Sequence, residues 1–588
     1  MALENLITDH LDLWTAAMRP KSCAGRGNNS KLELSGIKKL RDLILELAVR
    51  GKLVPQDPCD EPASVLLERI AAEKARLVKE GKIKKSKVLP KIGEEEQPFD
   101  LPEGWEWGCL GDIVAIIRGI TFPASEKHRE PSGERIACLR TANVQDKIEW
   151  DDLLYVKTSF VKRLEQRAEV GDIVMSMANS KELVGKVAYI EKIPSGSATF
   201  GGFLSVIRPY EIDASFLMTV LRAPQTRSVL IDSSSQTTNI ANISLEKLNP
   251  LVIAIPPLPE QHRIVAKVDE LMALCDQLEL RSESQLAAHQ MLVETLLATL
   301  TDSANADELA QNWARLSTHF DTLFTTEASI GALKQTILQL AVMGKLVPQD
   351  PSDEPASSLL ERIAAEKALL VKERKIKKEK PLPMIRAEEQ LFELPIGWEW
   401  VRFSQVAHSR LGKMLDNAKN IGNELPYLRN TNVQWDLIEL DDIKQMKIDD
   451  NEKDELALRY GDLLICEGGE PGRCAIWKHH NKEMYFQKAL HRARPYQGVM
   501  AEYLQICLTN DAATGTLEQY FTGATIKHFV GAKLNEYSIP LPPTAVQKLI
   551  VAKVDELTTL CDQLKSRLQT SQQTQLALAE SLVEGALA

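Results

Sequence analysis

Several familiar features are missing from this chain. No stretch of its 588 residues approaches the ~18 apolar residues of a membrane span, and the acidic, amphipathic start MALENLITDHLDLWTAAM does not predict a signal peptide. The nine cysteines include no C-x-x-C pair, and the ten histidines show no metal-ligand spacing, so we interpret His479 and His480 as a solvated loop pair. These absences argue against a disulfide framework and a metal site, and they favour a reducing cytoplasm.

The motifs of nucleotide hydrolysis and nuclease chemistry are also missing. A P-loop requires Gly-Lys followed by Ser or Thr. The Gly-Lys pairs at Gly51 and Gly344, for example, are followed by Leu. Glu-x-Lys triplets that begin at Glu80 and Glu373 lie in charged helix tails without a nearby carboxylate cluster. The sequence therefore predicts that this chain is not itself an enzyme.

A long internal duplication is present instead. Residues 40–107 match residues 333–400 without a gap, at a constant offset of 293. Residues 255–278 match residues 541–564 at an offset of 286. The stretches between the matched segments share only scattered positions. A constant frame with variable inserts indicates one scaffold that carries two different modules.

The charge distribution bears on the kind of partner. The net charge of −11 argues at first sight against nucleic acid. Residues 108–255, however, hold 17 basic and 17 acidic side chains, and residues 401–541 hold 17 and 19. The remaining −9 belongs to the scaffold. The modules are therefore nearly neutral, and a local basic face on each remains possible, with modest DNA affinity unless a partner adds phosphate contacts.

Short β-type runs alternate with turns and helices in both modules, so we predict an α+β fold for each. Each module ends in a proline pair and leads into a long helix with apolar residues in steps of three and four. The helix over 259–300 has 42 residues, or roughly 63 Å at 1.5 Å per residue. We expect the two long helices to pack as an antiparallel coiled coil, because neither can bury its apolar stripe alone. The apolar positions are Val268, Leu271, Cys275 and Leu278 in the first helix and Val554, Leu557, Cys561 and Leu564 in the second.

The rest of the scaffold is predicted to be helical. An amphipathic helix over residues 3–18 docks either on the scaffold or on another protein. The helix over 62–80 has a basic tail, which is either a contacting arm or a solvated helix end. The predicted domains are an N-terminal helical region (1–107), the first module (108–254), a central region with a long helix (255–400), the second module (401–540) and a C-terminal helix (541–588).

These features together resemble a known family. The proline pairs before long helices (PPLPEQHRIVAKVDEL and PPTAVQKLIVAKVDEL), the GD-[IL]-[VL] strand with its small-residue loop (GDLLICEGGEPGR) and the strands LRTANV and LRNTNV occur in duplicated order. In this the chain resembles the DNA-specificity subunit of type I restriction–modification enzymes. The long N-terminal portion is typical of the type IB branch.

The resemblance implies a division of labour among subunits. Each module would be a target recognition domain for one half of an asymmetric, bipartite DNA site. The paired helices would set the spacer and dock two methyltransferase subunits, and two restriction/translocase subunits would complete the complex. The adenine-N6 methylation and the ATP-dependent cleavage would belong to those partners, with their S-adenosylmethionine, ATP and Mg²⁺. The Pro-Pro pairs, followed by Leu258 and Thr544, indeed lack the aromatic residue of an adenine-methylating loop.

Three loops in each module are the candidate DNA contacts, by match to the family's loops. Arg pairs most often with guanine, and Asn or Gln with adenine. The alternative for each position is a solvated loop residue. For Arg140 and Arg429 it is a structural ion pair, and for the Trp105–Trp107 and Trp398–Trp400 pairs we favour anchoring of the module to the scaffold. The candidates are Lys127, His128, Arg129, Asn179, Ser180, Lys181, Thr237, Thr238 and Asn239 in the first module, and Lys413, Asn417, Lys419, Glu467, Gly468, Gly469, Arg473, Thr525, Lys527 and His528 in the second.

A second class of function stays open at this point. The modules could bind proteins, and the long helices could simply space them. DNA-binding modules on one rod would have to meet the same side of the duplex, with half-sites about one helical turn apart. The spacing of two recognised elements therefore distinguishes the two hypotheses.

Overall fold

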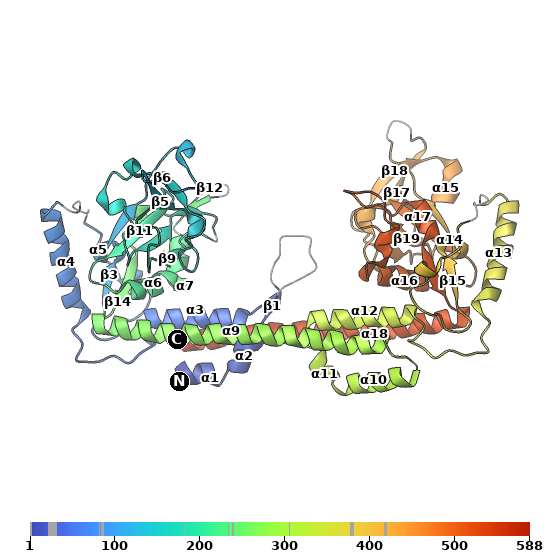
Figure 1. The fold of residues 1–588 in the computed structure, drawn as a ribbon, viewed down its shortest axis with the longest axis horizontal. Helices are drawn as coiled ribbons and strands as arrows, with labels where there is room; N and C mark the ends of the chain where they lie inside the picture. The colour runs from blue at the N-terminus through green and yellow to red at the C-terminus, as the bar shows by residue number, and fades with distance from the viewer. Residues whose placement is uncertain are drawn as a thin grey trace. The chain divides into compact units, whose positions relative to one another are not determined.

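The computed structural model describes residues 3–20, 32–81, 83, 88–181, 183–232, 234–237, 240–304, 306–376, 382–416 and 420–587. The chain divides into two compact units. Unit 1 comprises residues 1–284 and 571–588, and unit 2 comprises residues 285–570. Each unit holds one sheet-rich module together with helices of the scaffold (Figure 1). The predicted α+β fold with long helices is confirmed.

The two long helices begin directly after the proline pairs, as predicted. They are α9 (Leu258–Thr301) and α18 (Thr544–Leu587), each of 44 residues. At 1.5 Å per residue, each is about 66 Å long. A buried glutamine fastens the start of each helix: the Gln261 side chain donates to the Pro256 carbonyl at 2.9 Å, and Gln547 donates to Pro542 at 3.1 Å. Each helix contributes its first part to one unit and its last part to the other.

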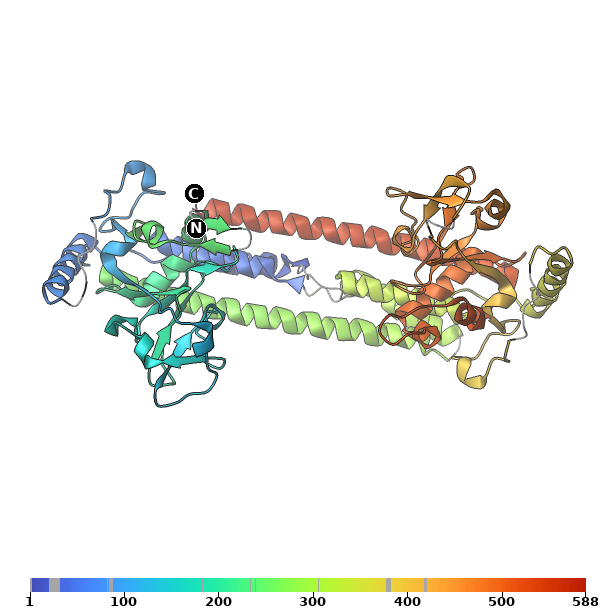
Figure 2. The same cartoon turned by 90° about the horizontal axis from the view of Figure 1, so that it is seen from above.

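In unit 1, α3 (Ser35–Val49) lies between the two long helices (Figure 2). Arg41 of α3 forms an ion pair with Asp276 of α9 at 2.7 Å. Lys39 of α3 forms another with Glu580 of α18 at 2.8 Å. Apolar residues such as Leu40, Leu43 and Ile44 are buried on α3. The long helices are therefore joined through α3 in this unit.

Contacts beyond the end of α3 give the directions of the helices. Gln56 follows α3 and donates to Glu260, near the start of α9, at 3.4 Å. Arg50 is also at the end of α3, and its guanidinium donates to the carbonyl oxygen of Leu587, at the end of α18, at 3.3 Å. Thus α3 is antiparallel to α9 and parallel to α18. The two long helices consequently run in opposite directions within unit 1, as predicted.

Unit 2 repeats this arrangement with the roles of the long helices exchanged. Here α12 (Glu327–Val342) packs beside the first part of α18. Lys334 forms an ion pair with Asp562, and Glu327 forms one with Lys565 at 3.3 Å, so α12 is antiparallel to α18. The end of α9 is held by Lys345, which donates to the Thr301 carbonyl at 2.7 Å. Each unit therefore has the same arrangement of one short and two long helices, which we call its helical frame.

Short helices cover each frame. The predicted helix over residues 3–18 is two helices, α1 (Leu3–Thr8) and α2 (Leu11–Ala16), because Asp9 and His10, both weak helix formers, interrupt it. Trp14 of α2 is fully buried, so this segment docks on the scaffold of its own unit. In unit 2, α10 (Ala306–Thr318) and α11 (Phe320–Leu323) contribute Leu316 and Leu323 to the core beside the end of α9.

The predicted charged helices are α4 (Ala63–Lys79) and α13 (Ala356–Lys372). Each follows a proline N-cap, and each bonds its first amide to a glycine carbonyl, at Gly104 and Gly397. Three apolar residues face inward on each helix, among them Leu66 and Leu359. Most of the two basic tails lies outside the described residues.

The first module is built on a four-stranded antiparallel sheet. Its order is β4 (Val114–Arg118), β11 (Leu204–Pro209), β7 (Ile173–Ser176) and β9 (Val187–Tyr189). A second sheet has the order β10 (Ala198–Phe200), β5 (Arg135–Leu139) and β6 (Leu154–Lys157). A third contains β12 (Ser235–Thr237), β13 (Ile240–Asn242) and β8 (Ala178–Asn179). The predicted helices appear as α6 (Ala214–Arg222), α7 (Pro224–Asp232) and α8 (Leu245–Leu248).

The second module has the same main sheets. The four strands are β16 (Ala407–Leu411), β22 (Leu490–Pro495), β19 (Leu463–Cys466) and β20 (Cys474–Ile476). The three-stranded sheet has the order β18 (Lys444–Ile448), β17 (Asn423–Leu428) and β21 (Tyr485–Phe486). Its helices include α16 (Ala501–Ala513) and α17 (Gly531–Glu536). The two modules therefore have the same topology in their main sheets, although their sequences share only scattered positions.

Each module is fastened to its helical frame through its first and last strands. In unit 1, β3 (Glu106–Cys109) pairs with β14 (Val252–Ile255), and in unit 2, β15 (Glu399–Arg402) pairs with β23 (Ser538–Leu541). The Trp105 indole donates to Glu260 at 3.0 Å, and that of Trp398 donates to Gln349 at 2.9 Å. These tryptophans anchor the modules, as favoured from the sequence.

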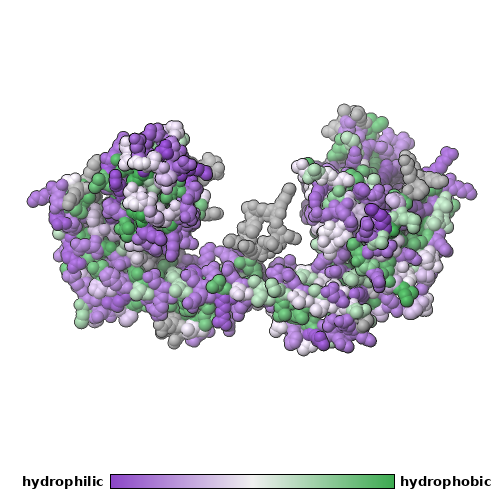
Figure 3. Space-filling view, in the orientation of Figure 1, coloured by the Kyte–Doolittle hydropathy of each residue, from purple (hydrophilic) through white to green (hydrophobic). Residues whose placement is uncertain are grey.

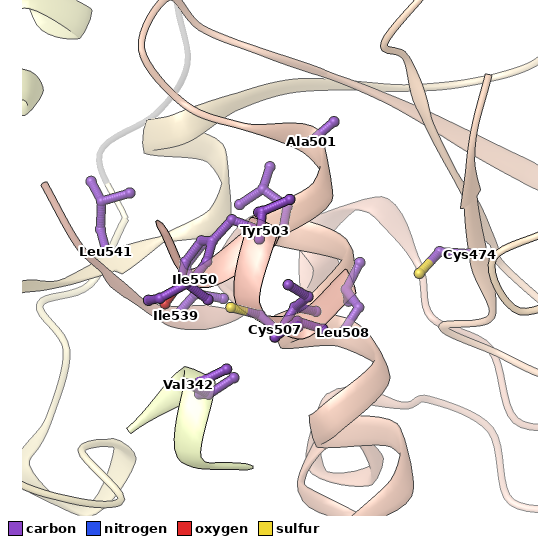
Figure 4. Packing of buried hydrophobic residues seen from close by; sticks show 14 of the residues in the cluster. Val342, Cys474, Ala501, Tyr503, Cys507, Leu508, Ile539, Leu541 and Ile550 are labelled. Carbon is purple, nitrogen blue, oxygen red and sulfur yellow. The ribbon is translucent and has the colours of Figure 1, made fainter. Parts of the chain in front are cut away.

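A continuous apolar core joins the second module to its frame. Figure 4 shows Tyr503 and Cys507 of α16 close to Ile539 of β23 and Ile550 of α18. The Tyr503 ring is fully buried, and its hydroxyl donates to the Pro540 carbonyl at 2.8 Å. The visible surface is hydrophilic over most of each module (Figure 3). The module and the helices beneath it therefore form one packed body within the unit.

Candidate nucleic-acid interface

The three candidate loops of the second module meet at one end of its main sheet. Backbone hydrogen bonds connect them in series. The amide of Lys413 donates to the carbonyl of Phe486 at 3.1 Å, that of Glu467 to Ala489 at 2.9 Å, and that of Phe529 to Glu467 at 2.7 Å. The early loop, the loop after the GD strand and the late loop are thereby held side by side, although they are far apart in the sequence.

The first module repeats the same connections. The amide of Ile120 donates to the Phe200 carbonyl at 2.8 Å, that of Met177 to Phe203 at 2.9 Å, and that of Ile243 to Met177 at 2.9 Å. In addition, Asn179 of β8 pairs with Ala241 of β13. The backbone frame of the candidate interface is therefore common to both modules, while its side chains differ.

Tight packing explains the glycines after the second GD strand. A Cβ atom on Gly468 would lie 3.0 Å from Nδ1 of His528. Gly469 has a φ of +83°, and a Cβ there would lie 3.0 Å from the Asn430 amide nitrogen. These glycines let two loops approach each other closely, and they bring His528 of the late loop beside the GD loop.

Asn430 belongs to this site, although the sequence did not single it out. Its side-chain amide donates to the Gly468 carbonyl at 3.3 Å, and its own carbonyl accepts from Arg473 at 2.8 Å. It follows β17 directly in the sequence LRNTNV. The sequence signal that could have identified Asn430 is its position as a polar residue at the carboxyl end of a predicted strand.

The predicted positions differ in exposure. Gly468 is buried by its neighbours, and Thr237 lies in β12. Thr238, Asn239, Asn417 and Lys419 lie outside the described residues. Half-buried are His128, Asn179, Lys413, Glu467 and Arg473. Exposed are Lys127, Arg129, Ser180, Lys181, Gly469, Thr525, Lys527 and His528.

Several candidate cations already have acidic partners. Lys413 pairs with Glu452, Lys527 lies 2.6 Å from Glu518, and Arg473 lies 3.0 Å from Glu470. These pairs lower the positive potential of the second module's loops. The charge count predicted such a weak electrostatic contribution.

The early loop of the first module departs from the common frame. His128 exchanges backbone hydrogen bonds with Tyr155 of β6, at 3.1 and 2.8 Å. Lys127 and Arg129 flank this bridge and therefore follow the three-stranded sheet. The connection from the early loop to the other two loops is made by Ile120 instead, seven residues earlier than Lys127.

Two recurring arginines, Arg140 and Arg429, are structural. Arg140 binds Asp152 at 2.6 Å, and Arg429 binds Asp442 at 2.5 Å, so the ion-pair interpretation is confirmed. The guanidinium in each pair lowers the pKa of its carboxylate partner. In the same way, the aspartate of the second GD motif, Asp462, binds Arg494 at 2.7 Å. The aspartate of the GD motif thus stabilises, through this ion pair, the strand that leads into the candidate loop at Glu467.

A buried histidine, His491, supports the late loop of the second module. The imidazole Nε2 of His491 lies 2.8 Å from the Phe529 carbonyl oxygen, to which the neutral ring donates. Burial lowers the pKa of His491 to about 4. His491 is therefore neutral at physiological pH and holds Phe529, whose amide in turn binds Glu467.

Within the described ranges, no cluster of three or more His, Cys, Asp and Glu residues is arranged to hold a metal ion. None of the helices there is both long and apolar enough to cross a membrane.

Comparison with known proteins assigns the class. The family model described as type I restriction modification DNA specificity domain matches residues 102–288 and 395–571, which are the two modules with the starts of their long helices. The chain therefore belongs to this family of specificity subunits. Family membership confirms the prediction of a non-catalytic subunit of a restriction–modification system and disfavours the protein-only scaffold. The type IB branch stays a prediction.

Two relatives align along their whole lengths. The type I restriction enzyme EcoEI specificity subunit of Escherichia coli is 42% identical, with all of both chains covered. The EcoAI specificity subunit, also of Escherichia coli, is 42% identical with the same coverage. A solved structure, titled for complex assembly and conformational transition of the type I R-M system, has a TM-score of 0.50 at 18% identity. It covers 83% of this chain and 99% of its own, and it supports the fold.

Proposed function

We propose that this chain binds an asymmetric, bipartite DNA site, with one half recognised by each module. The observation that carries the proposal is the common loop frame. Both modules join three loops by the same backbone contacts, yet the loops present different side chains, such as Lys181 in one and Arg473 in the other. A constant frame with variable polar groups is what recognition of two different base sequences requires.

The loop charges indicate how the DNA is held. Because the modules are nearly neutral and several candidate cations are paired, their loops contribute few free charges to phosphate contacts. Neutralised phosphates supply much of the affinity of DNA-binding proteins. We therefore assign most phosphate contacts to partner subunits and base contacts to the loops of this chain.

The duplicated helices are the proposed docking surface for two methyltransferase subunits. The octapeptide IVAKVDEL occurs unchanged at 264–271 and 550–557. Its exposed residues are retained along with the buried ones, including Asp269 and Asp555. A buried residue is constrained by packing, whereas an exposed residue repeated in both copies points to the same partner on each. Two restriction/translocase subunits complete the complex, and S-adenosylmethionine, ATP and Mg²⁺ are bound by the partners, in the cytoplasm.

The direct test is selection of bound DNA from a random-sequence duplex pool by the chain reconstituted with its methyltransferase subunits. We expect one enriched motif with two fixed half-sites and a spacer of constant length. A matched control carries the same chain with residues 401–540 deleted, and only the other half-site should then be enriched. A motif without a spacer, or no enrichment by the assembled complex, would refute the proposal.

A further inference from the structure

A short turn lies at the centre of each candidate interface. In the first module, the Leu204 amide donates to the Gly201 carbonyl at 2.8 Å and closes a four-residue turn. In the second, the Leu490 amide donates to the Gln487 carbonyl at 3.0 Å and closes the matching turn. The offset between the turns is 286, as for the long helices. The turn is therefore part of the common frame.

The backbone of the first turn is fixed on two sides. The Phe203 carbonyl accepts from the Met177 amide, which begins the loop after the GD strand, at 2.9 Å. On the other side, a Cβ atom on Gly202 would lie 3.1 Å from Cγ2 of Thr121, in the early loop. The turn consequently occupies the space between two candidate loops, and its outward side chain has a defined position.

The outward side chain is unusual for a solvent-exposed place. Phe203 is 69% exposed, and no other phenylalanine in the described part of the chain is comparably exposed. A large apolar ring held in water among polar loops is the kind of exposed residue that marks a contact. In the matching turn of the second module the exposed residue is Lys488. At the offset of 286, Phe203 corresponds to Ala489 and Lys488 corresponds to Gly202, so adjacent positions of one turn carry an aromatic ring in one module and a cation in the other.

We infer that the Phe203 ring packs against bases of the half-site recognised by the first module, an inference that rests on the proposed function. Aromatic rings stack on bases, and apolar side chains inserted at a base step deform the duplex. Lys488, one position earlier in the matching turn, makes an ionic contact to DNA in the second module. The two half-sites are therefore recognised by contacts of different physical kinds that come from the same turn of the frame.

The test uses the chain assembled with its methyltransferase subunits and a duplex that carries the motif selected by the unaltered complex. Phe203→Ala should weaken binding roughly 5- to 150-fold, the range that loss of one base–aromatic stack produces. Phe203→Tyr should stay within about twofold, because a tyrosine ring also stacks. The control is Val170→Ala: Val170 is 63% exposed and precedes β7, at the opposite end of that strand, so affinity should not change.

Salt dependence separates the two kinds of contact. Lys488→Ala should reduce the slope of log affinity against log salt by about 1, whereas Phe203→Ala should leave that slope unchanged. Repeat selection with Phe203→Ala should relax the first half-site only. Affinity within twofold of the unaltered complex would overturn this inference while leaving the proposed function intact. Loss of methyltransferase binding instead of DNA affinity would also overturn it, and absence of any motif with the unaltered complex would refute the proposed function itself.

Discussion

Lys52 donates from its side-chain Nζ to the carbonyl oxygen of Leu587, 3.0 Å away, at the C-terminal end of α18. Lys345 occupies the same position in the second copy of the repeat and donates to Thr301 at the end of α9, at 2.7 Å. The last carbonyls of a helix lack intrahelical partners and favour a nearby cation. Each long helix therefore starts at its own module and ends at a lysine of the duplicated frame.

Removal of these lysines should loosen the helix ends selectively. We expect Lys345→Ala to speed amide hydrogen exchange in the last turns of α9, and Lys52→Ala to do so in α18, each at a cost of about 1 kcal/mol. Lys345 should have the larger effect, since it also donates to Ser303 at 3.0 Å. Lys192→Ala, at an exposed position in the first module, is the control. Equal exchange in all three variants would contradict the capping role.

The lengths of α9 and α18 should set the spacer of the DNA site. Insertion of about four residues in 285–300 should therefore lengthen the gap between the half-sites. The structure adds that both helices connect the units, so a matching insertion after Thr570 is required. Four residues add about 6 Å of helix, or about two base pairs. Motif selection should show a longer spacer with unchanged half-sites for the double insertion.

The single insertions serve as the comparison. An insertion in α9 alone moves Thr301 relative to Lys345 and strains α18, so weaker binding without a clean new spacer is expected. If a half-site changed while the spacer stayed constant, the helices would not be the ruler.

The modules should act independently. Replacement of residues 108–254 by the equivalent module of a relative should change one half-site only, because each module has its own loop frame and packs within its own unit. Selection of bound DNA reads out both halves together. The reciprocal exchange of residues 401–540 is the matched control, and a change in both halves after either exchange would show that the modules are coupled.

Acidification should destabilise unit 2 through His491. Its pKa is about 4 in the folded protein, below the ordinary 6.5, so the unfolded chain binds more protons between these values. Stability is therefore lost as pH falls from about 6.5 to 4, by up to roughly 3 kcal/mol. Denaturant unfolding of His491→Asn should show a smaller loss over this window. A parallel decline in both proteins would assign the effect to other groups.

The sequence predicted the features that depend on local pattern. Apolar steps predicted both long helices, and the match to the family's loops selected Gly468 and His528, which the structure brings close together. An apolar stripe does not specify its partner, so the placement of α3 between the long helices could not be foreseen. Asn430 and Phe203 were missed because their importance comes from neighbours distant in the chain. Family membership, in contrast, followed from the order of duplicated motifs.

The most direct measurement of the central claim is a map of N6-methyladenine across the host genome, with and without this gene. Deletion should abolish methylation at one bipartite motif of constant spacer, and expression of the chain should restore it. The Phe203→Ala variant should restore it less completely, with lower methylation at the same sites. If the same motifs stayed methylated without the gene, in cells that express its methyltransferase partner, this chain would not be the source of their specificity.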